Sequence, residues 1–125
     1  MHQIAIISEN LILSKLLDSY IKRKVPECKV TRFSSFSAIK EKIHRGDFEL
    51  IMVDGIISGM ASYEIINYLR SKKRINCPIY YFSEVSDDYI KIKALKNGVN
   101  YHYRKPFDAH SVTNEIASYL VESYN

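Results

Sequence analysis

Short apolar runs alternate with segments of helical period along this chain, and that alternation limits the fold more than any other feature of the sequence. The third run, at about residues 48–53, ends in four consecutive apolar residues, as is typical of a parallel strand covered on both faces. It is followed by a segment that places Ile65, Ile66 and Leu69 at helical spacing. Repetition of this kind indicates βαβ units around a parallel sheet.

The same spacing predicts five strands that alternate with five helices. We expect strands at about residues 3–8, 28–33, 48–53, 79–82 and 101–104, with the last helix from about residue 109. Asn10 and Asp87 are predicted N-caps, and Gly98 is predicted to end the fourth helix. Because crossovers between parallel strands are right-handed, the fold class is α/β, a doubly wound, five-stranded parallel sheet in a three-layer sandwich. The simplest strand order is the flavodoxin-like 2-1-3-4-5.

Length and composition set the limits within which a function must be found. A chain of 125 residues that is 46% hydrophobic and 26% charged fits a single domain over residues 1–125. Its formal charge of +4 is modest, and its basic residues cluster at predicted helix ends, which argues against direct nucleic-acid binding. No apolar stretch approaches bilayer length and no secretory signal is recognisable, so we expect no membrane contact and a cytoplasmic location.

Polar side chains end four of the apolar runs, and parallel strands bring such ends to one edge of the sheet. They are the pair Ser8 and Glu9, then Asp54, Ser83 and Lys105. The two carboxylates form a hard oxygen site suited to Mg²⁺. A lysine ammonium and a serine hydroxyl can hold phosphoryl oxygens, and an aspartate beside a metal ion can attack phosphorus to give an acyl phosphate.

Each of these residues also has a simpler interpretation. A single aspartate at a strand end is commonly a helix cap, although its coincidence with Ser83 and Lys105 favours a site. Glu9 would be stabilised by a helix dipole without any metal, so both roles stay open. His102 is more often an ordinary half-buried histidine than a functional one.

Over essentially its whole length the chain resembles the CheY-like receiver domains of two-component response regulators, as a divergent member. The motifs that carry this resemblance are Ile-Met-Val-Asp at 51–54, Tyr-Tyr-Phe-Ser at 80–83, Ala-Leu-Lys-Asn-Gly-Val at 94–99 and Arg-Lys-Pro-Phe at 104–107. The resemblance implies that Asp54 is the phosphoacceptor and that Ser83 and Lys105 assist it. It also makes His102 the switch residue.

The resemblance further implies a cofactor and partners. Mg²⁺ would be bound by Glu9, by Asp54 and by the backbone carbonyl of Ile56, with Ser8 as a further candidate acting through water. A histidine kinase or phosphotransfer protein would supply the phosphoryl group. A downstream protein target would bind the face made by the fourth helix, fifth strand and fifth helix, and a homodimer is possible. The domain itself would not be an enzyme.

Several positions depart from the receiver pattern. Ser8 replaces a second acid, Glu84 follows the switch hydroxyl, Ser58 replaces a proline, and Ala61-Ser62 replaces an Asp-Gly turn. These departures keep a second hypothesis open, a pseudo-receiver that binds proteins without phosphorylation. An aspartate-based phosphohydrolase would need an acid where Ile56 stands. A dinucleotide-binding enzyme would need a glycine-rich turn after the first strand.

Overall fold

The computed structural model describes residues 1–55, 57, 59–83 and 88–122, and these residues form one five-stranded parallel sheet. The strands are β1 (His2–Ile7), β2 (Cys28–Phe33), β3 (Leu50–Asp54), β4 (Ile79–Ser83) and β5 (Tyr101–Arg104). They lie in the order β2-β1-β3-β4-β5, and every neighbouring pair is parallel. The predicted order is therefore confirmed, with strand ends that differ by one or two residues.

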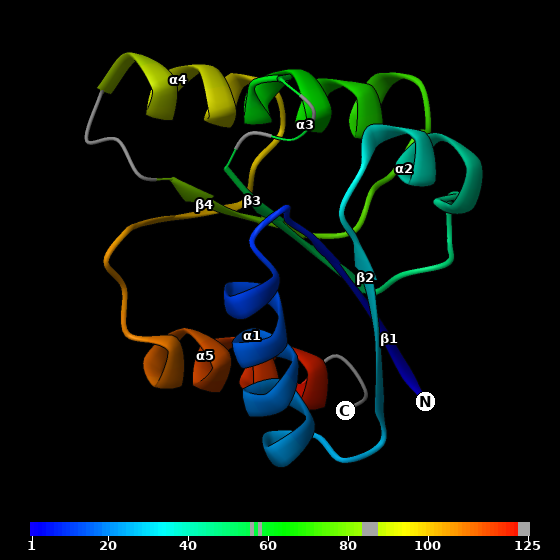
Figure 1. Cartoon of the computed structure of the whole chain (residues 1–125). Helices are drawn as coiled ribbons and strands as arrows, with labels where there is room; N and C mark the ends of the chain where they lie inside the picture. Colours follow the sequence, from blue (N-terminus) through cyan, green and yellow to red (C-terminus); the bar gives the residue numbers. More distant parts are fainter. Residues whose placement is uncertain (56, 58, 84–87, 123–125) are drawn as a thin grey trace.

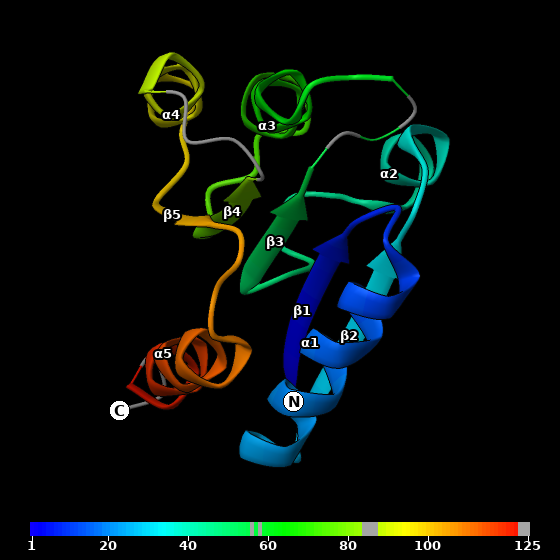
Figure 2. The ribbon, with the colours of Figure 1, turned by 60° about the vertical axis from the view of Figure 1, so that its left-hand side comes forward.

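Five helices cover the two faces of the sheet. They are α1 (Leu11–Lys24), α2 (Phe36–Lys42), α3 (Ser62–Ser71), α4 (Asp88–Lys96) and α5 (Ala109–Glu122). Helices α1 and α5 pack on one face, and α2, α3 and α4 pack on the other (Figure 1). A view turned by 60° separates these layers clearly (Figure 2). Among the described residues, no helix is both long enough and apolar enough to cross a bilayer.

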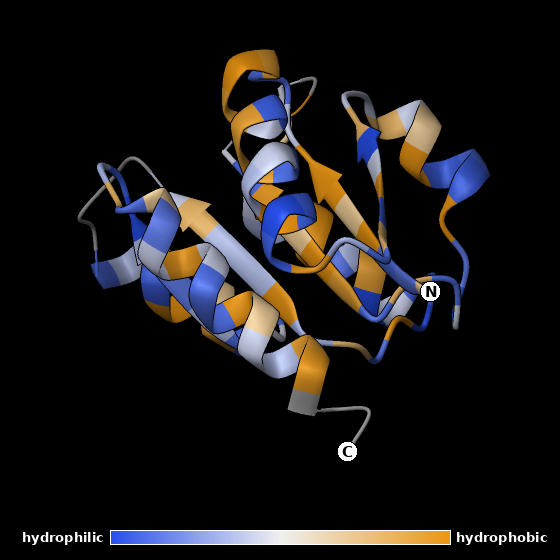
Figure 3. Cartoon of the chain, turned by 90° about the horizontal axis from the view of Figure 1, so that it is seen from below, coloured by the Kyte–Doolittle hydropathy of each residue, from blue (hydrophilic) through white to orange (hydrophobic). Residues whose placement is uncertain are grey.

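The core divides into two clusters because successive side chains of a strand point to opposite faces. Along β3, Ile51 and Val53 join the cluster under α2, α3 and α4, whereas Leu50 and Met52 join the cluster under α1 and α5. All four are 0–1% exposed. Figure 3 shows the central strands mostly in hydrophobic colours. Full burial of such a side chain stabilises the fold by about 1.5–3 kcal/mol, so β3 anchors both layers.

Helix ends largely follow the predicted signals. The side chain of Asn10 accepts a hydrogen bond of 3.0 Å from the amide of Leu13, which makes it the N-cap of α1. Gly98 follows α4 at a φ of +104°, a conformation that favours glycine. Asp87, the other predicted cap, lies outside the described residues.

Some apolar residues at helical spacing face solvent instead of the core. Leu16 is 42% exposed, and Ile92 and Leu95 on α4 are about half exposed. Helix α1 reaches the core through Leu17 and Ile21. Periodicity identifies a helix, but the width of the buried stripe depends on how closely the helix approaches the sheet.

Arg70 connects the end of α3 to the loops that lead into β4 and β5. Its guanidinium donates to the carbonyl oxygens of Ile75, Cys77 and Gly98 at 2.7–3.0 Å, and to the Oδ1 of Asn100 at 2.8 Å. The side chain also fills the space beside Gly98, where an added Cβ would come within 2.8 Å of the arginine Nε. A planar fork of donors suits this cluster of backbone oxygens.

We expect Arg70→Met to lower the free energy of unfolding by about 2–4 kcal/mol, because several partly buried carbonyls lose their donors together. Urea unfolding followed by circular dichroism measures this. Arg45→Met, which removes an exposed arginine from a loop, is the matched control and should change stability by less than about 0.5 kcal/mol. Equal losses in the two variants would contradict the assigned role of Arg70.

Candidate functional site

Asp54 is the last residue of β3 and lies beside the end of β1, because Ile7 and Val53 are partners in the parallel ladder. Ser8 follows β1 directly, and its hydroxyl donates a hydrogen bond of 2.7 Å to Oδ2 of Asp54. Both residues are buried, at 2% and 5% exposure. The structure therefore brings together the two strand ends that the sequence predicts to meet.

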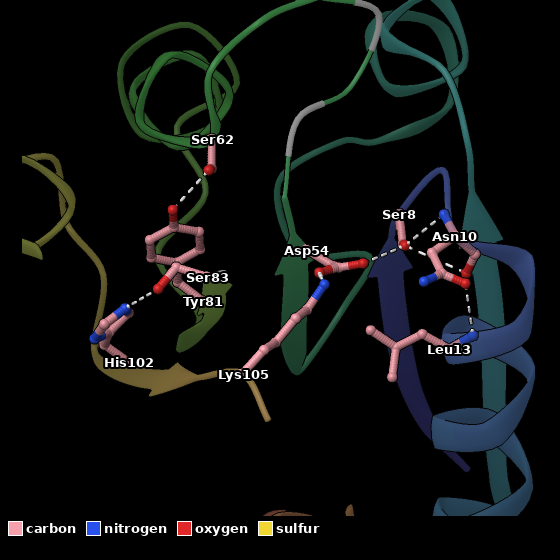
Figure 4. A network of polar contacts seen from close by, with 9 residues as sticks. All are labelled: Ser8, Asn10, Leu13, Asp54, Ser62, Tyr81, Ser83, His102 and Lys105. Carbon is pink, nitrogen blue, oxygen red and sulfur yellow. Dashed lines mark hydrogen bonds and ion pairs between the residues drawn. The ribbon is translucent and has the colours of Figure 1, made fainter. Parts of the chain in front are cut away.

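The turn between β1 and α1 fixes the direction of the Ser8 hydroxyl. The amide of Asn10 donates to the Ser8 Oγ at 2.9 Å, while the Asn10 side chain caps α1 through the amide of Leu13 (Figure 4). An oxygen that already accepts this hydrogen bond can direct its own proton to Asp54. Sequence reasoning treated Ser8 as the loss of an acid and missed this contact.

Lys105 comes from the opposite side of Asp54. Its ammonium group forms an ion pair with Oδ1 of Asp54, and its backbone amide donates a hydrogen bond of 2.7 Å to the carbonyl of Ser83. The Lys105 side chain is only 18% exposed. A carboxylate buried this deeply needs a neighbouring positive charge, because desolvation would otherwise favour its protonated form. Apart from this ion pair, Oδ1 has no hydrogen-bond partner within the described part of the chain.

Ser83 ends β4, next to the strand of Asp54, and its hydroxyl is directed away from the aspartate. It lies 2.6 Å from Nε2 of His102 on β5 (Figure 4). The centres of the His102 and Tyr81 rings lie 5.2 Å apart. The Tyr81 hydroxyl accepts a hydrogen bond of 2.8 Å from the Ser62 hydroxyl. Burial, followed by the charge of Lys91, lowers the pKa of His102 below its ordinary value. The imidazole is therefore neutral near pH 7.

Two of these contacts were not predicted from the sequence. Ser62 occupies the position where receiver domains usually carry a turn glycine, yet it is 6% exposed and bonded to Tyr81. The direct contact of Ser83 with His102 was also missed. An indication was available, because the two residues lie on neighbouring strands of the predicted sheet and both follow aromatic residues.

The predicted metal ligands are only partly placed. Glu9 is exposed, at the surface beside Ser8, whereas Asp54 is buried. Ile56, whose carbonyl was the third predicted ligand, lies outside the described residues, as do Ser58 and Glu84. Within the described ranges, no group of three or more His, Cys, Asp or Glu side chains could hold a metal ion.

Comparisons with known proteins agree on the kind of domain. The sequence model of the response regulator receiver domain matches residues 4–117. Among curated proteins, hybrid signal transduction histidine kinase D of Dictyostelium discoideum is 29% identical over 92 residues, which make up 73% of this chain. The aligned part is only 6% of that much longer protein.

Solved structures show the same fold at low sequence identity. A two-component response regulator from Clostridium difficile has a TM-score of 0.81 at 17% identity, covering 100% of each chain. A receiver domain from Rhodospirillum rubrum has a TM-score of 0.81 at 14% identity, covering 95% of this chain and 93% of its own. The BeF3-activated DrrB receiver domain has a TM-score of 0.75 at 17% identity, with coverage of 96% and 97%.

The family match extends over most of the chain, and the sheet order and the meeting of Asp54 with Lys105 agree with it. Receiver domains of this family are modules of two-component signalling. This chain belongs to the response regulator receiver domain family.

Proposed function

We propose that Asp54 is a phosphoacceptor and that the domain receives a phosphoryl group from a histidine kinase or phosphotransfer protein. The observation that carries this proposal is the position of Asp54, buried at the end of β3 between the Ser8 hydroxyl and the Lys105 ammonium. A carboxylate held in this way has a cation beside it to balance the added negative charge.

The chemistry follows from these contacts. One carboxylate oxygen of Asp54 forms a bond to phosphorus while the phosphorus–nitrogen bond of the partner's phosphohistidine breaks. The departing imidazole keeps the electron pair and takes up a proton. Lys105 stays beside the new acyl phosphate and offsets its charge, as charge-assisted hydrogen bonds are the strongest available to phosphoryl oxygens.

The residues present fit a Mg²⁺ site of reduced charge. Asp54 supplies a buried carboxylate whose Oδ1, apart from its ion pair with Lys105, has no partner among the described residues, and Glu9, next to Ser8 in the sequence, supplies a second carboxylate. Ser8 could contact the ion through water. When bound, Mg²⁺ would neutralise charge on the transferring phosphoryl oxygens. The backbone carbonyl of Ile56 remains a proposed ligand.

We assign His102 to the switch. A neutral imidazole can accept the Ser83 proton at Nε2, and this contact holds the hydroxyl away from Asp54. A phosphoryl group on Asp54 would offer Ser83 more strongly charged acceptor oxygens. Ser83 would then leave His102, and the ring would lose the hydrogen bond that fixes its position on Tyr81.

The output surface is proposed to be the face of α4, β5 and α5. Large apolar side chains are exposed there, namely Tyr89, Ile92, Leu95, Tyr101 and Val121, each 47–59% accessible. Exposed apolar side chains gathered on neighbouring elements commonly mark protein contacts. Either a downstream target or a second copy of the domain could cover them.

One observation favours the alternative, a pseudo-receiver that signals through protein contacts alone. Ser8 hydrogen-bonds to the carboxylate of Asp54 where receiver domains usually carry a second acid. Ser8 and Lys105 thereby stabilise Asp54 without a metal ion, which weakens the need for one.

The phosphoacceptor role predicts that beryllofluoride, a mimic of the acyl phosphate, binds when Mg²⁺ is present. Fluorine NMR should show a bound signal for the wild type that is lost on chelation of Mg²⁺. Asp54→Asn should show no bound signal, because the amide cannot bond to beryllium in the same way.

Ser83→Ala is the matched control in that experiment, since it should retain a bound signal with a shifted position. Absence of a signal from folded wild-type protein at saturating Mg²⁺ would contradict phosphorylation and favour the pseudo-receiver.

Introducing an acid at position 8 should make the stability of the domain depend on Mg²⁺. Ser8→Asp replaces a donor to Asp54 with a like charge, so we expect a loss of about 1–2 kcal/mol in unfolding free energy in the presence of EDTA. Mg²⁺ should reverse that loss, because the added carboxylate strengthens the site. Ser8→Ala loses the hydrogen bond as well but should gain no response to Mg²⁺. Equal Mg²⁺ responses of the two variants would count against the proposed metal site.

The pKa of His102 predicts a pH dependence of stability. Because this pKa is lowered in the folded state, the unfolded chain binds more protons, and stability contributed by neutral His102 is lost as the pH falls below the ordinary histidine value. Between about pH 7.5 and about pH 5.5, the wild type should therefore lose more stability than His102→Phe. Urea unfolding across this pH range measures the difference. If the unfolding free energies of the two proteins changed in parallel with pH, His102 would make no contribution to the pH dependence of stability.

A further inference from the structure

A groove of about 500 Å³ lies between α3 and α4. These two helices lie on the side of the sheet opposite α1 and α5 (Figure 2). Its apolar and aromatic lining includes Met60, Tyr63 and Tyr68. These side chains are half-buried, so an occupant could still cover part of each. The groove lies on the α3 side of α4 and is separate from the apolar face of α4 and β5.

Lysines give this groove a positive charge. Lys72 comes from the end of α3, and Lys93 and Lys96 come from α4 at the spacing that places them on one side of a helix. The single acidic residue among the described lining is Glu64, whose Oε1 already accepts a hydrogen bond of 3.3 Å from the amide of Ala61. Within the described residues, Lys72 and Lys96 form no ion pair.

Aromatic rings hold one of the lysines in place. The ammonium group of Lys93 lies 4.9 Å from the centre of the Tyr63 ring and 5.2 Å from that of Tyr89. A hydrogen bond with Tyr89 and the charges of the two tyrosines raise its pKa, so this group stays protonated. A cation that is already positioned loses less conformational entropy when it binds an anion.

We propose that the groove between α3 and α4 binds an acidic segment of a partner protein. Carboxylates of the segment would pair with Lys72, Lys93 and Lys96, and an apolar side chain would cover Met60 and the tyrosine rings. The complementary charge supports this occupant, and an open trough between two helices is the shape that peptide segments enter. This proposal does not rest on the phosphorylation of Asp54.

Other anions fit the groove less well. The side-chain amide of Asn97 donates a hydrogen bond of 2.7 Å to the carbonyl of Lys93, which fixes its orientation on α4. Nucleic acid gains its affinity from many phosphate contacts, and three lysines on one short groove provide few.

The test uses two labelled peptides and the full chain. One carries aspartates on both sides of a central leucine, and in the other each aspartate is asparagine. Fluorescence anisotropy should show that the acidic peptide binds and the asparagine peptide does not. In NMR spectra of the protein, the amide signals that shift on binding should belong to residues 60–72 and 93–97. Lys93→Glu and Lys96→Glu should each weaken binding by about tenfold or more, because each reverses a charge in the groove.

Lys91→Glu changes the same charge on the same helix outside the groove lining and should alter the affinity by no more than about twofold. Equal weakening by Lys91→Glu would show that net charge alone attracts the peptide, and the proposal would fail. It would fail also if the asparagine peptide bound equally well.

Displacement of the peptide by a thymidine oligonucleotide that shifts the same amides more strongly would reassign the groove to nucleic acid. If the amide signals of the groove residues shifted when the protein concentration alone was raised, the groove would be reassigned to a second copy of the chain.

Discussion

The ion pair between Asp54 and Lys105 is the interaction on which the arrangement of this site depends. Asp54 ends β3 and Lys105 follows β5, so β4 lies between the strands that supply the two charges. The pair forms only when all three strands adopt the observed order and the Lys105 amide reaches the carbonyl of Ser83. A buried carboxylate without its cation would be costly, and the sheet order and the site therefore support each other.

Ser8 changes the balance of charge around that pair. A second carboxylate at this position would leave the site negative and dependent on a metal ion. The serine hydroxyl instead donates to Asp54 while Lys105 neutralises it, so one anion faces one cation. A phosphoryl group adds roughly two negative charges, and Lys105 alone cannot balance them. If Asp54 is phosphorylated as proposed, a Mg²⁺ ion held by Glu9 would supply the further positive charge.

The sequence predicted the fold well because hydrophobic periodicity distinguishes strands from helices. The order of the strands and the cap at Asn10 are confirmed, and Ile65, Ile66 and Leu69, placed at helical spacing in the sequence, are all buried. Contacts between side chains of different elements were harder to foresee, and the bonds from Ser8 to Asp54 and from Ser62 to Tyr81 were missed. Such contacts depend on the direction of each side chain in three dimensions, which a spacing of residues does not encode.

Helix α4 joins the two surfaces proposed to bind proteins. Ile92 and Leu95 face solvent on its apolar side, whereas Lys93 and Lys96 line the groove, because residues one position apart lie about 100° apart around a helix. Of its described side chains, the small Ala94 is the buried one. Both proposed surfaces therefore include side chains of this one helix. A partner bound to either surface would therefore favour one position of α4. Ser83, at the end of β4, precedes this helix in the chain, and His102, on β5, follows it.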